Sequence, residues 1–259
     1  MLEKFWALSF VALLFIPLEY WTAAEPRQRT LRAGWKTDLL HFLLNDALTR
    51  VALVFPLVLL ILFLRGFVSA GLQETVQRQP AGLQLTEALS LVILIGYWAH
   101  RMQHEVPWLW KFHAVHHSSR ELDWLAAVRQ HPMDEVFTRS LQFAPLYWLG
   151  FSKETFGAAV IFLGLYGLFL HSNTRLRFGC LRHLVAMPEY HRWHHSGERK
   201  AYNTNYSILP CVDRLFGTCH MPGVERPAFY GVREDVPQDY WRQLLHPFHK
   251  RESRPDVTR

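Results

Sequence analysis

The chain contains few charged residues and few cysteines. Charged side chains account for 19% of its 259 residues, whereas hydrophobic residues account for 50%. The three cysteines, Cys180, Cys211 and Cys219, are an odd number without the spacing of a metal site. They do not make a disulfide framework, and we expect them to be reduced thiols.

Three signatures of common protein classes are also missing. The chain has no glycine-rich dinucleotide fingerprint, and its paired histidines lack the glutamate of the H-E-x-x-H zinc proteases. The formal net charge is +6, but the basic residues do not form one run. We therefore expect no nucleic acid partner. Basic segments beside a membrane are instead attracted to anionic lipids.

Hydrophobic residues are concentrated in four blocks. A transmembrane helix needs about 20 largely apolar residues. Ala47–Phe67 meets this requirement, while Phe5–Tyr20 and Leu83–Trp98 are marginal. The fourth block, Leu141–Leu170, is interrupted by Ser152-Lys153-Glu154, which predicts a helical hairpin that enters the bilayer and returns. We predict an all-α integral membrane protein with about four transmembrane helices, including this hairpin.

The first block has two interpretations. Lys4 and the apolar stretch after it would suit a secretory signal, and Thr22-Ala23-Ala24 offers a cleavage site. The bulky Glu19-Tyr20-Trp21 instead suits the end of a transmembrane helix, because aromatic rings lie at headgroup level. We favour the transmembrane helix.

Basic residues predict the orientation in the membrane. The loop after the first block contains Arg27, Arg29, Arg32 and Lys36, whereas the loop after the second contains little beyond Arg78. By the positive-inside rule the first loop is cytoplasmic, so the N-terminus lies outside and the third block ends inside. The histidine-rich segments then form a cytoplasmic helical cap. A compact chain without added domains suggests a bacterial inner membrane, with the endoplasmic reticulum as the alternative.

Histidines are clustered in three short motifs. H-x-x-x-H occupies residues 100–104, and H-x-x-H-H occurs twice, at 113–117 and at 191–195. Residues three or four apart share a helix face, so each motif can present its imidazoles to a metal ion. Eight imidazoles exceed the roughly four to six donors of one first-row ion, which indicates two ions. Imidazole suits zinc, copper, iron and nickel, so the residue type leaves the metal open.

The order of these motifs resembles the fatty acid hydroxylase and sterol desaturase superfamily of membrane oxidases. The resemblance covers roughly residues 36–220, within what we expect to be a single membrane-embedded domain with a C-terminal tail at 221–259. It depends on HRMQH (100–104), HAVHHSS (113–119), RQHPMDE (129–135), HSN (171–173), EYHRWHHS (189–196), NTNY (203–206) and DRLFGTC (213–219).

The resemblance implies a non-haem di-iron centre that uses O₂ and two electrons to hydroxylate or desaturate a lipid, such as a sterol or a fatty acyl chain. It implies no catalytic residue beyond the metal ligands. Carried over position by position, those ligands are His100, His104, His113, His116, His117, His171, His191, His194 and His195. Some members place a further ligand one helical turn before the histidine that matches His171. Here that region is Tyr166-Gly167, which leaves one position open.

The electrons would come from a separate donor protein, a reductase or a small electron carrier, because the chain has no dinucleotide fingerprint. Two other functions are considered. A membrane metal-binding or metal-transport protein would carry ionisable residues within its transmembrane helices, but Ala47–Phe67 and Leu83–Trp98 contain almost none. A zinc-dependent lipid hydrolase would need a general-base motif, and none is evident.

Side chains near the motifs are candidates for holding the second ring nitrogen of each histidine. We expect these acceptors among the neighbouring acids and amides: Asp123, Asp134, Glu135, Asn173, Glu189 and Asn203. Most tryptophans suit anchoring at the membrane interface. Trp193, which lies inside a metal motif, is a candidate for lining the site.

Other histidines are expected outside the metal centre. His131 suits a structural role, and His41, which lies among leucines, suits the membrane interface. The remaining ones lack partners at ligand spacing: His183, His220, His246 and His249. The tail after about Pro227 is expected to pack loosely, with RESRPDVTR partly disordered.

Overall fold

A computed structural model of the chain describes residues 2–64, 66–223 and 225–249. Within these ranges the secondary structure is helical, with two isolated β-bridges and no strand. The α-helices are α1 (Leu2–Thr22), α2 (Trp35–Leu64), α3 (Ala70–Gln77), α4 (Ala81–Glu105), α5 (Pro107–His116), α6 (Pro132–Leu149), α7 (Lys153–His171), α8 (Pro188–His194), α9 (Pro210–Leu215) and α10 (Tyr240–Leu245). The short 3₁₀ helices are η1 (Trp124–Val128), η2 (Gly179–His183), η3 (Arg199–Ala201) and η4 (His246–Phe248).

Four helices of the described chain are long and apolar enough to cross a membrane: α1, α2, α4 and α7. Their outward side chains include large apolar groups, such as Leu13 and Val51, which are 78% and 79% exposed. An α-helix satisfies its backbone hydrogen bonds internally, so such a surface can face lipid. The expected all-α membrane fold with four membrane-length helices is confirmed.

The predicted hairpin consists of α6 and α7. The C-cap residue of helix α6 is Gly150, whose φ of +86° is a left-handed conformation that glycine adopts without strain. Ser152 then caps α7 by accepting a hydrogen bond from the Thr155 backbone N–H. Of the two helices, α7 alone has the length and hydropathy of a membrane span.

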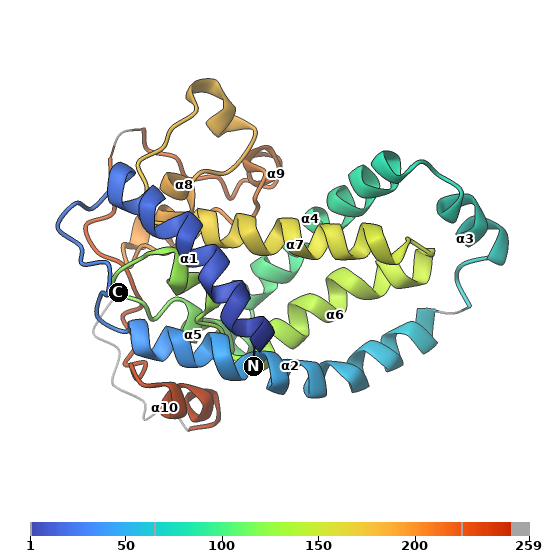
Figure 1. The fold of residues 1–259 in the computed structure, drawn as a ribbon, viewed down its shortest axis with the longest axis horizontal. Coiled ribbons are helices and arrows are strands. Elements are labelled where there is room, and N and C mark those ends of the chain that lie inside the picture. The colour runs from blue at the N-terminus through green and yellow to red at the C-terminus, as the bar shows by residue number, and fades with distance from the viewer. Residues whose placement is uncertain (1, 65, 224, 250–259) are drawn as a thin grey trace.

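The long helices position the histidines at one end of the molecule. Helix α6 packs against both α2 and α4, and Leu146 of α6 is buried against Ala88 and Val92 of α4. The far ends of α2, α4, α6 and α7 extend toward α3, whereas α5, α8, α9 and α10 gather at the opposite end (Figure 1). This second end carries the histidine motifs.

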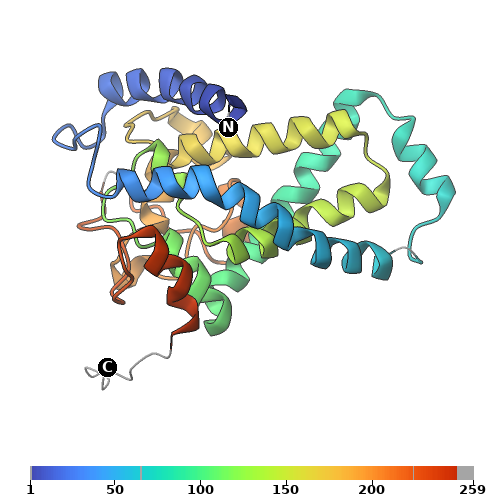
Figure 2. The ribbon, with the colours of Figure 1, turned by 60° about the horizontal axis from the view of Figure 1, so that its bottom comes forward.

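Helix α1 is packed onto the histidine end. It lies against the first part of α2 and the last part of α7 (Figure 2). The ring of Phe15 stacks on Trp124, with 6.2 Å between ring centroids. The buried Glu19 carboxylate accepts hydrogen bonds from the backbone N–H groups of Trp124 and Asn173, each at 2.8 Å. Helix α1 is therefore an integral part of the packed fold.

A buried ion-pair network joins the segment before α2 to η1. Asp38 pairs with both Arg32 and Arg129, each at 2.5 Å, and Arg32 also contacts Asp123 at 2.8 Å. All four side chains are at most 4% exposed. Charged groups leave water at low cost only when they are paired in this way. Arg32, counted above as a loop charge, is therefore a structural residue, whereas Arg27, Arg29 and Lys36 are exposed.

The C-terminal segment packs more tightly than expected. In α10, Tyr240 and Gln243 are at most 1% exposed, and Gln243 Oε1 lies 2.8 Å from His41 Nε2 of α2. Loose packing is therefore the wrong interpretation for α10, and so is an interfacial position for His41, which is 1% exposed. The RESRPDVTR segment lies outside the described residues.

Candidate metal centre

Each histidine motif lies at the C-terminal end of a helix. His100 and His104 occupy the last turns of α4, one helical turn apart. The H-x-x-H-H motifs complete α5 and α8, two short helices that each begin with proline at the first position, which proline tolerates because that N–H has no helical partner. The last histidine of each motif, His117 or His195, is the C-cap residue.

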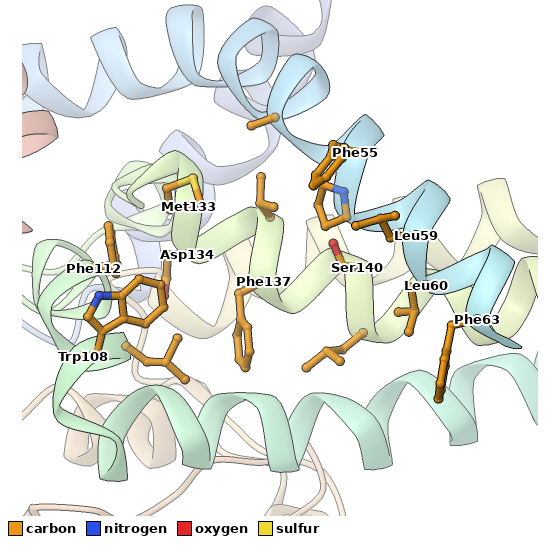
Figure 3. A pocket seen from close by; sticks show the side chains of 15 residues that line it. Phe55, Leu59, Leu60, Phe63, Trp108, Phe112, Met133, Asp134, Phe137 and Ser140 are labelled. Carbon is orange, nitrogen blue, oxygen red and sulfur yellow. The ribbon is translucent and has the colours of Figure 1, made fainter.

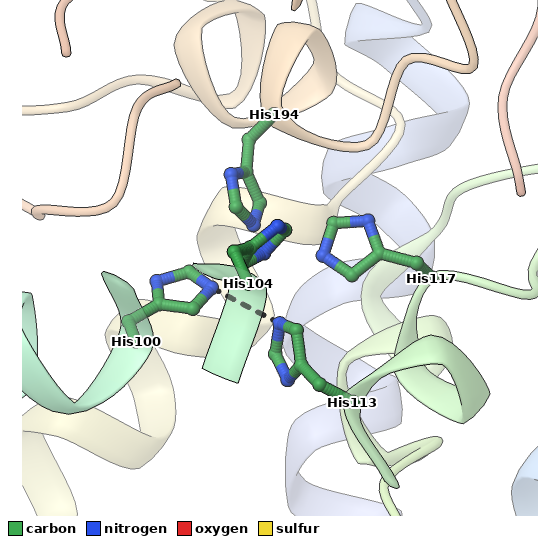
Figure 4. A group of neighbouring side chains, drawn as sticks. All are labelled: His100, His104, His113, His117 and His194. Atoms are coloured by element: carbon green, nitrogen blue, oxygen red, sulfur yellow. Dashed lines mark hydrogen bonds between the residues drawn. The ribbon is translucent and has the colours of Figure 1, made fainter. Parts of the chain in front are cut away.

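Five imidazoles from α4, α5 and α8 converge, and we refer to them as the first histidine group. Its members are His100, His104, His113, His117 and His194. One nitrogen of each ring lies within 4.8 Å of the corresponding nitrogen of every other, and the rings point toward one another (Figure 4). Nε2 of His100 and Nε2 of His113 are 3.2 Å apart.

The other four imidazoles form the second histidine group: His116, His171, His191 and His195. Nε2 of His171 lies 3.1 Å from Nε2 of His116 and 3.1 Å from that of His191, which is in turn 3.1 Å from Nε2 of His195. Nitrogens that share one ion at about 2.1 Å are themselves about 3 Å apart. The structure brings all nine sequence-predicted residues together, and it divides them into two groups.

Backbone carbonyls fix the orientation of four of the nine rings. Nδ1 lies 2.7–3.0 Å from a carbonyl oxygen in four imidazoles: His100 with Tyr206, His116 with Arg129, His171 with Gly167 and His194 with Thr204. In His113 the partner is instead the Asp134 carboxylate, at 3.0 Å. An Nδ1–H that donates to such an acceptor leaves the Nε2 lone pair free for a metal.

Only one of the expected side-chain acceptors has this role. Asp134 holds His113, and Gln103 in turn donates to Asp134. The others form contacts elsewhere: Asp123 with Arg32, Glu135 with Thr49 and Arg139, Glu189 with Arg177, and Asn173 with Arg192. Asn203 adopts a left-handed turn conformation, with φ of 57°. The missed acceptors are backbone carbonyls, which leave no residue-type signal in the sequence.

Several ring nitrogens are available to coordinate a metal because they have no hydrogen-bond partner in the described part of the chain. Nε2 of His104, His117 and His194 is buried and has no hydrogen-bond partner among the residues that the structure describes. All three belong to the first histidine group. A buried polar atom without a partner is costly, and coordination of an ion would remove that cost.

Burial also keeps the imidazoles in the metal-binding form. It lowers the pKa of His194 to about 3. It lowers the pKa of His116, His117, His191 and His195 well below the ordinary value, and the neighbouring imidazoles lower each of them further. These rings are therefore neutral at neutral pH, which is the state that ligates a metal.

The other singled-out residues lie outside both groups. His131 caps α6 by accepting from the Met133 N–H, and its Nε2 contacts the Leu244 carbonyl oxygen, in agreement with a structural role. Trp193 is buried but faces His220 and Lys200 and lines a separate cavity. The interpretation of Trp193 as a residue lining the metal site is therefore wrong.

An apolar cavity of about 650 Å³ lies between α2, α5 and α6 (Figure 3). Its lining is mostly apolar, with Phe55, Leu59, Phe112 and Phe137 among its residues. At one end it reaches Asp134, the residue that holds His113. No histidine of either group lines it. The cavity is therefore connected to the first histidine group through Asp134, which lines the cavity and contacts Nδ1 of His113.

Comparison with known proteins agrees with this geometry. The model of the fatty acid hydroxylase family matches residues 86–218, about half of the chain, and this range includes all nine histidines of the two groups. The chain belongs to the fatty acid hydroxylase family. Its resemblance to the wider superfamily of membrane oxidases is thereby confirmed.

Two curated relatives illustrate the range within the family. The ornithine lipid hydroxylase OlsE of Rhizobium tropici is 36% identical over 176 residues, which cover 66% of this chain and 52% of that protein. The human alkylglycerol monooxygenase is 32% identical over 123 residues, 47% of this chain and 27% of the relative. The chain thus aligns with about half of the first and about a quarter of the second. No solved structure matches the chain.

Proposed function

We propose that this protein is a membrane-bound non-haem di-iron oxidase that modifies a lipid with O₂ and two electrons. The observation that carries the proposal is the division of nine buried or half-buried imidazoles into two groups, each able to hold one ion. When bound, two iron ions would supply the reduction of O₂ and the attack on a C–H bond. Zinc has no redox chemistry and would not serve.

Hydroxylation is favoured over desaturation by the names of the relatives, which are a lipid hydroxylase and a monooxygenase. In a hydroxylation, a C–H bond of the lipid becomes C–OH with one oxygen atom from O₂. The other oxygen atom leaves as water, with two electrons and two protons supplied. A separate electron-donor protein would provide the electrons.

The residues of the chain would position the substrate and exclude water. We propose that the hydrocarbon chain of the lipid occupies the apolar cavity between α2, α5 and α6, where it lies against the Asp134 and His113 side of the first histidine group. Apolar walls keep water away from the reacting carbon. The Asp134 carboxylate holds the His113 ring in place by accepting from Nδ1–H.

The orientation proposed from the sequence is supported by the exposure of Arg27, Arg29 and Lys36, which remain free to face an anionic cytoplasmic surface. We place the histidine end on the cytoplasmic side of the membrane, in a bacterial inner membrane. There a cytoplasmic electron donor would reach it.

The proposed site for the hydrocarbon chain is tested by filling the cavity. Ser140 lines it, and Ser140→Trp would occupy space that the chain needs. We expect KM for the lipid to rise about tenfold or more with iron content unchanged, because about 1.4 kcal/mol of lost binding is tenfold. The control is Leu62→Trp on the exposed face of α2. An unchanged KM in Ser140→Trp would place the hydrocarbon chain elsewhere.

The reaction is tested with ¹⁸O₂. Cells that express the protein are grown under labelled oxygen, and their lipid extracts are analysed by mass spectrometry for a product with one ¹⁸O atom. We expect this product with the wild type and with His183→Ala, a histidine outside both groups, but not with His116→Ala. Labelled product from His116→Ala would contradict the proposal. Metal uptake into vesicles without any oxygenated lipid would favour transport.

A further inference from the structure

The face of α8 that points away from the metal groups lines a second, polar cavity. His191, His194 and His195 share one face of this helix, and Glu189, Arg192 and Trp193 share the opposite one, as the helical repeat requires. These last three residues line a cavity of about 340 Å³. The proposed reaction uses none of them.

The lining of this cavity carries an excess of positive charge. Four arginines, Arg175, Arg177, Arg192 and Arg226, line it together with two glutamates. Both glutamates are paired with cations, and Arg226 lies 3.4 Å from the Glu25 carboxylate, which is not part of the lining. Glu189 contacts Arg177 at 2.5 Å, and Glu225 contacts Lys200 at 3.2 Å. The cavity therefore suits an anion, and arginine is well adapted to binding phosphate and carboxylate oxygens.

Two hydrogen-bond donors and one acceptor in the lining, the acceptor being Glu189 Oε1, have no partner in the described chain. Nε of Arg192 and Nε1 of Trp193 are buried, and neither donates to any atom of the described chain. The side chains are 4% and 1% exposed. Buried donors are nearly always satisfied in folded proteins, so this pair points to a ligand that accepts hydrogen bonds.

The cavity lies where two membrane-length helices end. Ala24 follows α1 by two residues and Thr174 follows α7 by three, and both line the cavity. A β-bridge between Ala23 and Thr174 ties the two helix ends together. The last turn of α1 exposes Tyr20 and Trp21, side chains typical of the headgroup level. In a membrane, an anion site at this depth would face lipid headgroups.

We propose that this cavity binds the headgroup of an anionic phospholipid, with the phosphate oxygens accepting hydrogen bonds from Arg192 and Trp193. Arg175 and Arg226 supply further positive charge at the rim. The site is separate from the apolar cavity, because the two share no lining residue. Bound lipid would hold α8, and with it three histidines, against the ends of α1 and α7.

The test is a lipid titration of the full, iron-loaded protein in detergent, read by native mass spectrometry. The probes are phosphatidylglycerol, phosphatidylcholine and inorganic phosphate. We expect phosphatidylglycerol to bind the wild type about tenfold or more tightly than phosphatidylcholine, and the Arg175→Gln/Arg226→Gln variant to lose this preference. The matched control is Arg199→Gln, an exposed arginine of the same end that does not line the cavity.

A second variant separates a specific contact from general surface charge. Trp193→Phe removes the Nε1 donor without changing the charge, and we expect it to weaken phosphatidylglycerol binding severalfold. Iron content and melting temperature, measured on every variant, identify any that fail to fold. Equal binding of both lipids by the wild type would overturn the proposal. So would a preference for phosphatidylglycerol that the double arginine variant retains, or that Arg199→Gln loses to the same extent. Displacement of the lipid by equimolar inorganic phosphate would overturn it as well.

Discussion

The two histidine groups are built from the same motifs in opposite proportions. The first takes His113 and His117 from the α5 motif and only His194 from the α8 motif. The second takes His191 and His195 from α8 and only His116 from α5. Each H-x-x-H-H motif therefore contributes an i, i+4 pair to one group and a single ring to the other.

The groups differ in what the long helices add. Helix α4 adds the i, i+4 pair His100 and His104 to the first group, whereas α7 adds His171 alone to the second. The position one turn before His171 is Gly167, whose carbonyl oxygen lies 2.8 Å from His171 Nδ1. The second group therefore corresponds to the first with one imidazole missing. Its ion would keep a coordination position for another ligand.

The largest expected effect comes from removing one ring from each group. His116→Ala leaves three imidazoles in the second group, and we expect one iron per chain to be lost and turnover to fall more than about 100-fold, beyond the usual effect of a residue that merely supports a ligand. His104→Ala leaves four in the first group, and we expect most of the iron to remain. Iron per chain and product formation are measured for both.

Equal iron loss in the two variants would contradict this difference between the groups. His183→Ala serves as the control, because this exposed histidine contacts Arg214 and lies outside both groups.

A smaller effect is expected from weakening the support of a single ligand. Asp134→Asn keeps the shape of the side chain but removes the negative charge that His113 Nδ1–H donates to. We expect the first histidine group to lose iron to a chelator at roughly 10-fold to 100-fold lower chelator concentration. The second group should be unaffected, and release of both irons together would show that the groups do not act separately.

The missing imidazole can be supplied. A Cβ at position 167 would meet no atom within 4 Å, so Gly167→His should be accommodated, and the change also favours the helix. We expect iron of the second group to resist chelation severalfold more than in the wild type. Gly164→His, one turn away from that position and equally open, is the control. Identical chelator resistance in the wild type and Gly167→His would refute the correspondence between the groups.

Acid should destabilise the folded state of the metal-free protein, with both histidine groups contributing to the effect. Burial lowers the pKa of His194 in the first group and of His191 in the second, so below about pH 6.5 the unfolded chain binds more protons than the folded one. We expect the melting temperature of the metal-free protein to fall by several degrees between pH 7 and pH 5. Scanning fluorimetry measures this change, and a flat profile would contradict the assigned protonation states.

The sequence predicted the ligand candidates and the membrane-length helices because both depend on local periodicity. Because His113, His116 and His117 are three or four residues apart, they lie on the same side of a helix. The apolar blocks are long enough to indicate membrane-length helices from the sequence alone. The burial of Arg32 and His41 depends on Asp38, Asp123 and Gln243, which are joined to them only by the fold. Tertiary pairing of this kind leaves no periodic signal in the chain.

The presence of two iron ions is tested by counting iron in the wild-type protein. The protein is purified without oxygen from cells grown with ⁵⁷Fe and examined by Mössbauer spectroscopy. We expect about two irons per chain in two distinguishable environments, one for each histidine group. One iron or none per chain, or zinc in both groups despite abundant iron, would contradict it.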